Sequence, residues 1–424
     1  MSPTTDTTAT DDLTSVTLAP PDHTYLHMDT ARRPMHWAMV LEIAEDARRL
    51  DIDEVRERVR ERAARYDIFR MGIANGRWRA PRVVVTETVD ADRQVSADEY
   101  SDRTDLHVRI AKELETPLRR ADPFWHITLY TPRNTGRQVV VLRVHHSISD
   151  GIAGAAFAAL LADGSAEDLA EFDRFAASPR FHIADVDPAE LATAKEAFKG
   201  QWEAAKDVRG WPALSRSGRR EVAFYSISTR DVRRIARSHQ ASVHELLVAA
   251  IGSAVSTTPP AQRSAGAKLA RVTLPVTLDA QFRHTGNAVS VSLLNLALDQ
   301  PDLAAQIQRS QAELGLIEKQ RPELALAATD TAPRLPWPLQ RAVVNASMAH
   351  MSPDVHIGIN PGFTRIRSIL GAQIEYLTPL SPLAGYSFSV TALVLGTRTT
   401  FGVVADATTL AGYADTFVAA FDKV

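Results

Sequence analysis

The pattern of apolar and polar positions is clearest between residues 138 and 161. The run from Gln138 to His145 is almost entirely Val and Leu, which predicts a strand buried on both faces. The segment from Gly151 to Leu161 is apolar and rich in Ala, which predicts a helix that packs closely on a sheet. A strand, a loop and a helix in this order place the loop at the carboxyl edge of a sheet, where α/β proteins tend to carry their chemistry.

Similar patterns predict elements on both sides of this unit. Before it, the predicted strands are 38–43 and 125–130, and the predicted helices are 52–64 and 106–118. After it, the predicted strands are 222–226, 269–275, 386–395 and 399–405, and the predicted helices are 191–206, 230–239, 242–255, 303–318 and one from about 411. Both halves alternate helices and strands, so two similar domains are plausible.

Composition shifts divide the chain into four parts. Residues 1–17 are rich in Thr and Asp and poor in large apolar side chains, which predicts a disordered N-terminus. Residues 18–165 form the first predicted domain and residues 221–424 the second. Residues 166–220 are polar and contain Pro179, Pro188 and Pro212, so we interpret them as a linker or crossover.

The overall composition narrows the class of function. The chain has 424 residues, 45% hydrophobic and 23% charged, with a net charge of −3, which is ordinary for a globular protein without a basic field for nucleic acid. It contains no cysteine, which excludes disulfides, thiolate nucleophiles and Cys-ligated zinc. We see neither a secretory signal nor an apolar run of membrane-spanning length, and so expect a cytoplasmic protein with at most peripheral membrane contact.

The loop predicted at the sheet edge reads His145-His146-Ser147-Ile148-Ser149-Asp150-Gly151. A neutral imidazole at the end of a rigid strand suits a general base near pH 7, since its unperturbed pKa is about 6.5. His146 is the residue we expect to act as this base. Asp150, beside a turn that Gly151 permits, can fix the loop, and His145, at the strand end, is more readily structural.

Other chemistries lack their signatures. The sequence has no Gly-x-Ser-x-Gly elbow of a serine hydrolase, and no dinucleotide or P-loop fingerprint. His23, His27 and His36 have no convincing partner set for a metal, so we expect no metal and no cofactor.

The His-His-x-x-x-Asp-Gly motif resembles the signature of the acyl-CoA-dependent acyltransferases, which include chloramphenicol acetyltransferase and the condensation domains of peptide synthetases. Further segments resemble the bacterial wax ester synthase/diacylglycerol acyltransferase family. These are Asp22–Leu26, Pro34–Trp37, Pro117–Trp125, Leu274–Thr277, Gly286–Asn287, Asn360–Gly362 and Leu370–Ala372. The resemblance extends from about Leu18 to Val424, and only the His motif is highly specific.

This resemblance implies a fold and a substrate path. The expected fold class is α/β (α+β), with two chloramphenicol-acetyltransferase-like domains forming a pseudo-dimer. A tunnel between the domains would admit the acyl thioester from one side and the acceptor from the other, with His146 at the centre.

The resemblance also implies roles for individual residues. His146 matches the catalytic base, Gly151 the turn, and Asp150 a residue that holds the loop through an Arg ion pair. Asn287 matches a residue near the reaction centre, where its amide could contact a substrate oxygen or the oxyanion.

Four further residues are candidates for substrate contact. Trp125 matches the aromatic of the family's Pro-Leu-Trp block and is more readily scaffold than pocket lining. His145, Ser149 and Gly286 flank the expected reaction centre and complete the set.

Two segments depart from the family pattern. An Asn-Asp pair appears here as His244-Glu245, and the Arg usually found after Pro-Val-Ser is replaced around Leu278-Asp279. The expected partner of Asp150 is then Arg271 or Arg283, unless the ion pair is lost. These departures make acyl transfer itself a firmer expectation than storage-lipid synthesis.

The expected function is O-acyl transfer from a thioester, such as acyl-CoA, to a fatty alcohol, diacylglycerol or small-molecule hydroxyl. One alternative is a specialised-metabolite or condensation-type enzyme that uses an acyl donor on a carrier protein. Another is a non-catalytic carrier- or lipid-binding homologue. We expect a monomer or weak dimer that binds no nucleic acid.

Overall fold

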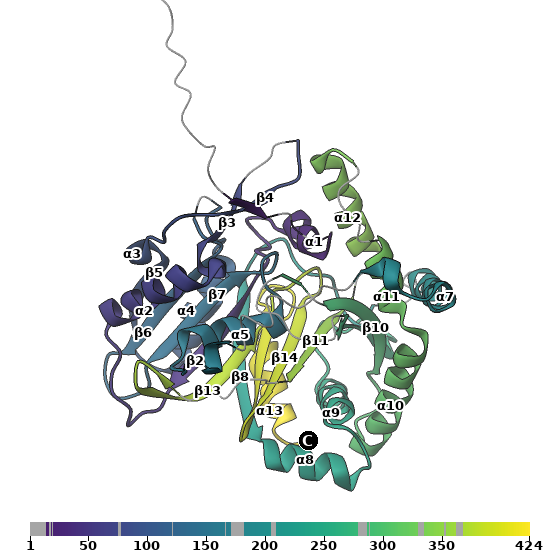
Figure 1. Ribbon diagram of the computed structural model, residues 1–424. Coiled ribbons are helices and arrows are strands. Elements are labelled where there is room, and N and C mark those ends of the chain that lie inside the picture. Colours follow the sequence, from purple (N-terminus) through teal and green to yellow (C-terminus); the bar gives the residue numbers. More distant parts are fainter. Residues whose placement is uncertain are drawn as a thin grey trace, which may run out of the picture.

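The computed structural model describes residues 14–16, 18, 20–74, 78–120, 122–165, 167–170, 182–204, 209–278, 286–287, 289–329, 335–351, 353–361 and 368–424. Within these ranges the chain forms two six-stranded sheets and one small three-stranded sheet, with helices packed around them (Figure 1). The mixed α/β fold class expected from the sequence is confirmed.

The first six-stranded sheet has the order β12-β13-β2-β7-β6-β5. Its strands are β2 (His36–Ile43), β5 (Val95–Tyr100), β6 (Trp125–Pro132), β7 (Val139–His145), β12 (Ser368–Ile369) and β13 (Ala372–Leu380). Every residue of β7 is buried, as its run of Val and Leu predicted.

Helices and a small sheet surround the first sheet. They are α1 (Pro20–Met28), α2 (Ile52–Arg65), α3 (Ala91–Gln94), α4 (Arg103–Glu115), α5 (Gly151–Leu161), a 3₁₀ turn (Asp67–Arg70), and β1 (Thr14–Val16), β3 (Met71–Ala74) and β4 (Arg82–Val85). Strand β1 lies within the segment 1–17 that we expected to be disordered. It pairs antiparallel with β4, which corrects that prediction for these three residues.

The second six-stranded sheet has the order β10-β9-β11-β14-β15-β8. Its strands are β8 (Arg220–Ser228), β9 (Leu269–Thr277), β10 (Val289–Ala297), β11 (Val355–Pro361), β14 (Phe388–Leu395) and β15 (Arg398–Asp406). The helices of this half are α7 (Pro188–Ala204), α8 (Thr229–Ser238), α9 (Val243–Thr257), α10 (Leu303–Gln320), α11 (Pro322–Thr329), α12 (Trp337–Met351) and α13 (Tyr413–Phe421), and a 3₁₀ turn spans Ile183–Asp185.

The two halves exchange a strand. Strand β13 comes from the C-terminal half, yet it pairs antiparallel with β2 and completes the first sheet. It passes so close to β15 that a Cβ at Gly402 would lie 2.0 Å from the carbonyl oxygen of Pro379. The first sheet therefore contains strands from both sides of residue 221, the domain boundary that we predicted from composition.

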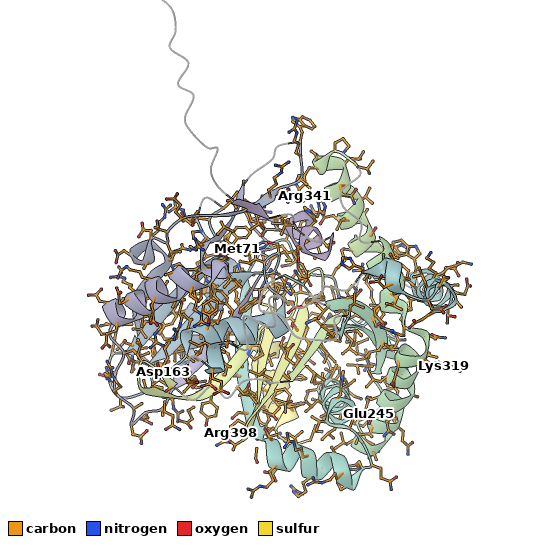
Figure 2. All side chains as sticks on the ribbon, in the orientation of Figure 1. Met71, Asp163, Glu245, Lys319, Arg341 and Arg398 are labelled. Carbon is orange, nitrogen blue, oxygen red and sulfur yellow. The ribbon has the colours of Figure 1, made fainter. Side chains whose placement is uncertain are left out.

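The turn before β13 also contacts the first half. Leu370 and Gly371 both have positive φ, at 51° and 77°, and link β12 to β13. Asp163, labelled in Figure 2, lies just beyond α5. Its carboxylate accepts from the backbone N–H groups of Leu370 and Gly371, at 3.0 and 2.8 Å, and pairs with Arg58 at 3.0 Å. The end of α5 is thereby tied to the exchanged strand.

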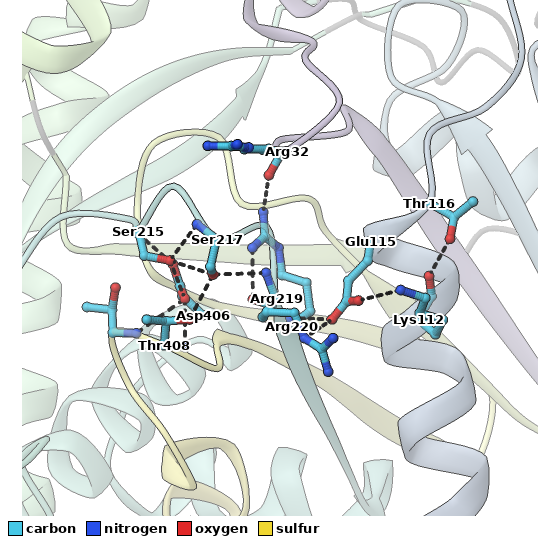
Figure 3. Close-up of polar contacts among 11 residues, drawn as sticks. Arg32, Lys112, Glu115, Thr116, Ser215, Ser217, Arg219, Arg220, Asp406 and Thr408 are labelled. Atoms are coloured by element: carbon cyan, nitrogen blue, oxygen red, sulfur yellow. Dashed lines mark hydrogen bonds and ion pairs between the residues drawn. The ribbon is translucent and has the colours of Figure 1, made fainter.

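A polar network joins the chain entering β8 to both halves (Figure 3). Glu115 at the end of α4 accepts from the backbone N–H of Arg220 at 2.9 Å and pairs with Arg219 at 3.3 Å. Asp406 is fully buried and accepts from the backbone N–H and the hydroxyl of Ser215, at 2.6 and 2.9 Å. These contacts hold the chain where it leaves the segment that we interpreted as a linker.

Candidate active site

The loop after β7 is held by hydrogen bonds from two segments, one at the start of β2 and one before β10. His146 N–H donates to the carbonyl of Met35 at 2.8 Å, and Trp37 Nε1–H donates to the carbonyl of Ser149 at 2.7 Å. On the other side, Gly286 donates to Ile148 at 2.5 Å and accepts from Asp150 N–H at 3.2 Å. The loop therefore bridges the first sheet and the segment that precedes β10.

Close packing of α5 supports this loop. A Cβ at Gly154 would lie 2.8 Å from the indole of Trp37, the side chain that bonds Ser149. The small side chains of this helix thus let it approach the sheet, as its composition predicted.

Asn287 determines which nitrogen of His146 carries the proton. The Asn287 Nδ2 group donates to Asp22 Oδ1 at 2.8 Å and to the carbonyl of His146 at 2.6 Å, so its Oδ1 is the atom that faces His146 Nδ1, at 2.8 Å. An amide oxygen only accepts, so the proton of neutral His146 lies on Nδ1. The lone pair is then on Nε2, which bonds no residue in the described part of the chain.

Tyr25 fixes the plane of the same imidazole. Its ring stacks on His146 with centroids 3.6 Å apart and planes within 9°. Burial lowers the pKa of His146 to about 3, although the bond to Asn287 acts in the opposite direction. His146 is therefore neutral at pH 7, with one ring nitrogen unprotonated.

His145 has the opposite tautomer. Its Nδ1 accepts from the N–H of Ser147 at 3.1 Å, so its proton lies on Nε2, which faces Asp29 at 3.7 Å. Burial would raise the pKa of Asp29, but His145, Arg120 at 2.9 Å and the N–H of Met35 hold it below its ordinary value. Phe124 stacks on the His145 ring at 4.2 Å. These contacts support the structural role predicted for His145, which stays a prediction.

A cavity of about 610 Å³ opens beside His146. Residues from both halves line it, including Tyr25 of α1 in the first half, and Trp202 of α7, Pro275 of β9 and Met348 of α12 in the second. Helices α1 and α12 lie together in Figure 1, where they contact each other above the second sheet.

The second sheet opens where the cavity enters it. Strands β9 and β11 pair only at Val272–Val355 and Thr273–His356, and they carry no further ladder beyond that point. Pro275 of β9, which has no N–H to donate, follows two residues later. The cavity extends into this opening and reaches His244 at the start of α9.

The candidate residues fall into two groups. His146 and Gly151 line the cavity, whereas Trp125, His145, Ser149 and Gly286 do not. Ser149 and Gly286 hold the loop through the hydrogen bonds given above. Trp125 is buried and donates from Nε1 to the carbonyl of Phe69 at 2.9 Å.

The structure bears on the expected roles of Asn287 and Gly151. Both N–H directions of the Asn287 amide are engaged, so this side chain orients His146 and has no donor left for an oxyanion. Gly151 does not have positive φ, so the turn does not require glycine there; the missing side chain leaves room beside Asn360, whose Oδ1 would lie 3.4 Å from a Cβ.

The ion pair expected for Asp150 stays a prediction. Arg271 donates to the carbonyls of Met351 and Ala204, at 3.3 and 2.6 Å. Arg283 and Asp279 lie outside the described residues.

Four site residues were not predicted individually. Asp22 and Tyr25 belong to the block Asp22–Leu26, and Asn360 to the block Asn360–Gly362, so their segments carried a signal but no role. His356 gave no signal in the sequence, because it depends on the strand pairing that brings it to the cavity wall.

The fold is shared with several solved enzymes. A wax ester synthase/diacylglycerol acyltransferase from Marinobacter aquaeolei VT8 superposes with a TM-score of 0.67, 17% identity and coverage of 96% of this chain and 98% of the other. The trichothecene 15-O-acetyltransferase of Fusarium sporotrichioides superposes with a TM-score of 0.66 and 10% identity, covering 98% of this chain and 97% of the other. The first condensation domain of the calcium-dependent antibiotic synthetase superposes with a TM-score of 0.64 and 15% identity, covering 96% of this chain and 95% of the other. The fold is that of the condensation domains and related acyltransferases.

The sequence comparisons define the family. Residues 18–239 match the wax ester synthase/diacylglycerol acyltransferase catalytic domain, and the chain belongs to this family. A probable diacylglycerol O-acyltransferase of Mycobacterium tuberculosis (strain H37Rv) is 26% identical over 324 residues, which cover 70% of each chain. The protein is an acyltransferase. In the described part of the chain no helix has the length and apolar character needed to cross a bilayer.

Proposed function

We propose that the protein transfers an acyl group from a thioester to a hydroxyl, with His146 as the general base. The observation that carries this proposal is the neutral imidazole of His146, whose Nδ1–H is held by Asn287 and whose Nε2 is left for a substrate at the cavity wall. Family membership supports the same reaction class.

The proposed reaction is direct transfer in a ternary complex. Nε2 of His146 accepts the proton of the acceptor hydroxyl while its oxygen attacks the thioester carbonyl carbon and forms a tetrahedral oxyanion. The C–S bond then breaks, and the imidazolium returns its proton to the departing thiolate. No covalent acyl-enzyme is required, which agrees with a chain that has no cysteine.

The oxyanion requires a donor other than Asn287. Asn360 lines the cavity beside Gly151, and among the described residues its Nδ2 donates one hydrogen bond, to the carbonyl of Ala392 at 3.4 Å. An amide nitrogen has two N–H groups, so one is available for substrate. We assign this donor to Asn360.

Thiol release tests the proposal directly. Purified protein is mixed with acyl-CoAs of graded chain length and a panel of alcohols, diacylglycerol and amines, and free thiol is followed; the protein contributes no thiol of its own. We expect acceptor-dependent release that falls by about 10²–10⁴-fold in His146→Ala. His239→Ala, at an exposed position, is the matched control.

Two results would contradict this mechanism: turnover that survives in His146→Ala, or a stable acyl adduct isolated from the protein during turnover. No release with any CoA donor leads to the same assay with a carrier-protein-bound donor, the alternative suggested by the condensation-domain fold. Failure with both donors would favour the non-catalytic alternative.

A further inference from the structure

A second histidine faces the cavity from the sheet. His356, Gly358 and Asn360 alternate along β11 and all three line the cavity. The ring of His356 stacks on Tyr386 with centroids 5.1 Å apart and planes within 11°. His356 lies close enough to His146 that a positive charge on His356 would lower the pKa of His146 further, after burial.

The hydrogen bonds of Thr273 define the tautomer of His356. The Thr273 hydroxyl donates its single proton to the carbonyl of Val355 at 3.3 Å, so it accepts from His356 Nδ1 at 3.2 Å. Burial lowers the pKa of His356 to about 4, which leaves the ring neutral with its one proton on Nδ1. Nε2 therefore carries a lone pair and can only accept a hydrogen bond.

This lone pair is uncovered. Nε2 bonds no residue in the described part of the chain, and a Cβ at position 358 would lie 3.3 Å from it, so Gly358 leaves the space beside it open. A second hydrogen-bond acceptor, the Oε1 of Gln201, belongs to a residue that lines the same cavity. The Nε2 of Gln201 donates to the carbonyl of Leu293 at 3.2 Å, whereas its buried Oε1 has no partner in the described part of the chain.

Unpaired acceptors in a buried wall favour a ligand that brings donors. We propose that the acceptor substrate carries, besides the hydroxyl that is acylated, a second O–H or N–H group that donates to Nε2 of His356. This proposal rests on the proposed transferase function and narrows its substrate class to diols, polyols and amino alcohols. A simple fatty alcohol has no second donor, and the free hydroxyl of diacylglycerol is the one that would be acylated.

Two alcohol substrates of the same chain length, which differ by one hydroxyl, test this inference. Initial rates are measured with a primary alkanol and with the vicinal alkanediol of the same chain length, and the ratio of the two kcat/KM values is the readout. We expect wild type to favour the diol, and His356→Phe, which keeps an aromatic ring on Tyr386, to lower the ratio about tenfold. Thr273→Val, which frees Nδ1–H and allows the other tautomer, is expected to lower the ratio by a smaller factor.

Gly358→Ala provides a variant that does not alter the histidine. Its methyl group lies over Nε2, so the diol preference should fall while the fold is retained; the nearest other atom is the methyl carbon of Thr391, at 3.2 Å. An equal effect of His356→Phe on both acceptors, or no preference in wild type, would overturn the proposal.

Calorimetric binding separates this inference from the transferase proposal. Inactive His146→Ala protein is titrated with the same diol and alkanol, with and without His356→Phe. Tighter binding of the diol that depends on His356 supports the subsite even if no acyl donor is turned over. Equal affinities for the two alcohols would contradict the subsite whatever the catalytic result.

Discussion

At the scale of single residues, the reactivity of His146 depends on an amide that lies far away in the sequence. Asn287 presents only its oxygen to the imidazole because Asp22 and the carbonyl of His146 occupy its N–H groups. The proton is thereby held on Nδ1 and the basic nitrogen faces the cavity. This arrangement predicts that Asn287 affects chemistry rather than substrate affinity.

We expect Asn287→Ala to lower kcat by about 10- to 100-fold with little change in the KM for the acyl donor. Without the amide oxygen, His146 populates both tautomers and more orientations, so only part of the enzyme has its base correctly placed. Steady-state kinetics test this, with Asn295→Ala on β10 as the control. A raised KM at unchanged kcat would instead indicate that Asn287 binds substrate.

The His motif could be recognised in the sequence, whereas its supporting contacts could not. His146, Asp150 and Gly151 lie within six residues of one another, directly after a strand whose apolar run predicted it. The stacking of Tyr25 and the bond from Asp22 depend on the docking of α1 against the loop, which no local pattern encodes. Trp125, which we expected more readily as scaffold than as pocket lining, is buried in the core.

At the scale of elements, the closest approach between strands is at Gly402. A Cβ there would lie 2.0 Å from the carbonyl oxygen of Pro379 and 2.7 Å from a methyl carbon of Leu380, where β15 crosses β13. Both strands are fixed by their own sheets, so neither can move away. Gly402→Ala should cost about 3 kcal/mol or more in the free energy of unfolding.

Gly315→Ala is the matched control for this prediction. Gly315 lies in α10 with nothing within 4 Å of its would-be Cβ, so alanine should stabilise the helix by roughly 0.5–1 kcal/mol. Urea denaturation of both variants measures the difference. If Gly402→Ala proved as stable as wild type, the close crossing of β13 and β15 would be contradicted.

The elements that were predicted are those whose apolar pattern is uninterrupted. Strand β7 and helix α5 were found with nearly their observed bounds. Strand β11 was missed although Val355, Ile357 and Ile359 alternate with His356, Gly358 and Asn360. This period-two alternation is the pattern that indicates a half-buried strand.

At the scale of the whole molecule, the two halves depend on each other. The exchanged strand β13 and the network around Glu115 and Asp406 connect them, and a third core cluster contains Val40 and Val141 of the first sheet together with Val222 and Val404 of the second. His146 lies in the first half and residues of both halves line the cavity, so one shared interior positions them. We expect unfolding to be cooperative across both halves.

The stability of this interior should fall in mild acid because it contains several neutral histidines. Burial lowers the pKa to about 3 for His146 and to about 4 for His356, His107, His126 and His27. The unfolded chain protonates these groups first, near pH 6.5. The contribution of these neutral histidines to the free energy of unfolding is therefore complete above about pH 6.5, and it is lost as the pH falls toward about 4.

Each fully buried histidine contributes a slope of about 1.4 kcal/mol per pH unit within this window. Burial raises the pKa of Glu42, Glu221 and Asp354, and their earlier protonation in the folded state opposes the slope. A single-histidine variant is therefore the cleanest measurement. His107 suits it, since it lies outside the cavity, packs edge-on against Phe224 at 5.0 Å and has a buried Nε2 without a partner among the described residues.

His107→Leu removes one group that binds a proton when the chain unfolds, so the unfolding free energy should depend less steeply on pH. The stability of the variant relative to wild type should therefore rise as the pH is lowered. Urea denaturation at about pH 7.5 and about pH 5 measures this difference. His239→Leu, at an exposed position that meets water in both states, is the control and should parallel wild type. Equal slopes for His107→Leu and wild type would show that His107 is protonated alike in the folded and unfolded chain, and that burial of this imidazole does not contribute to the acid sensitivity of the fold.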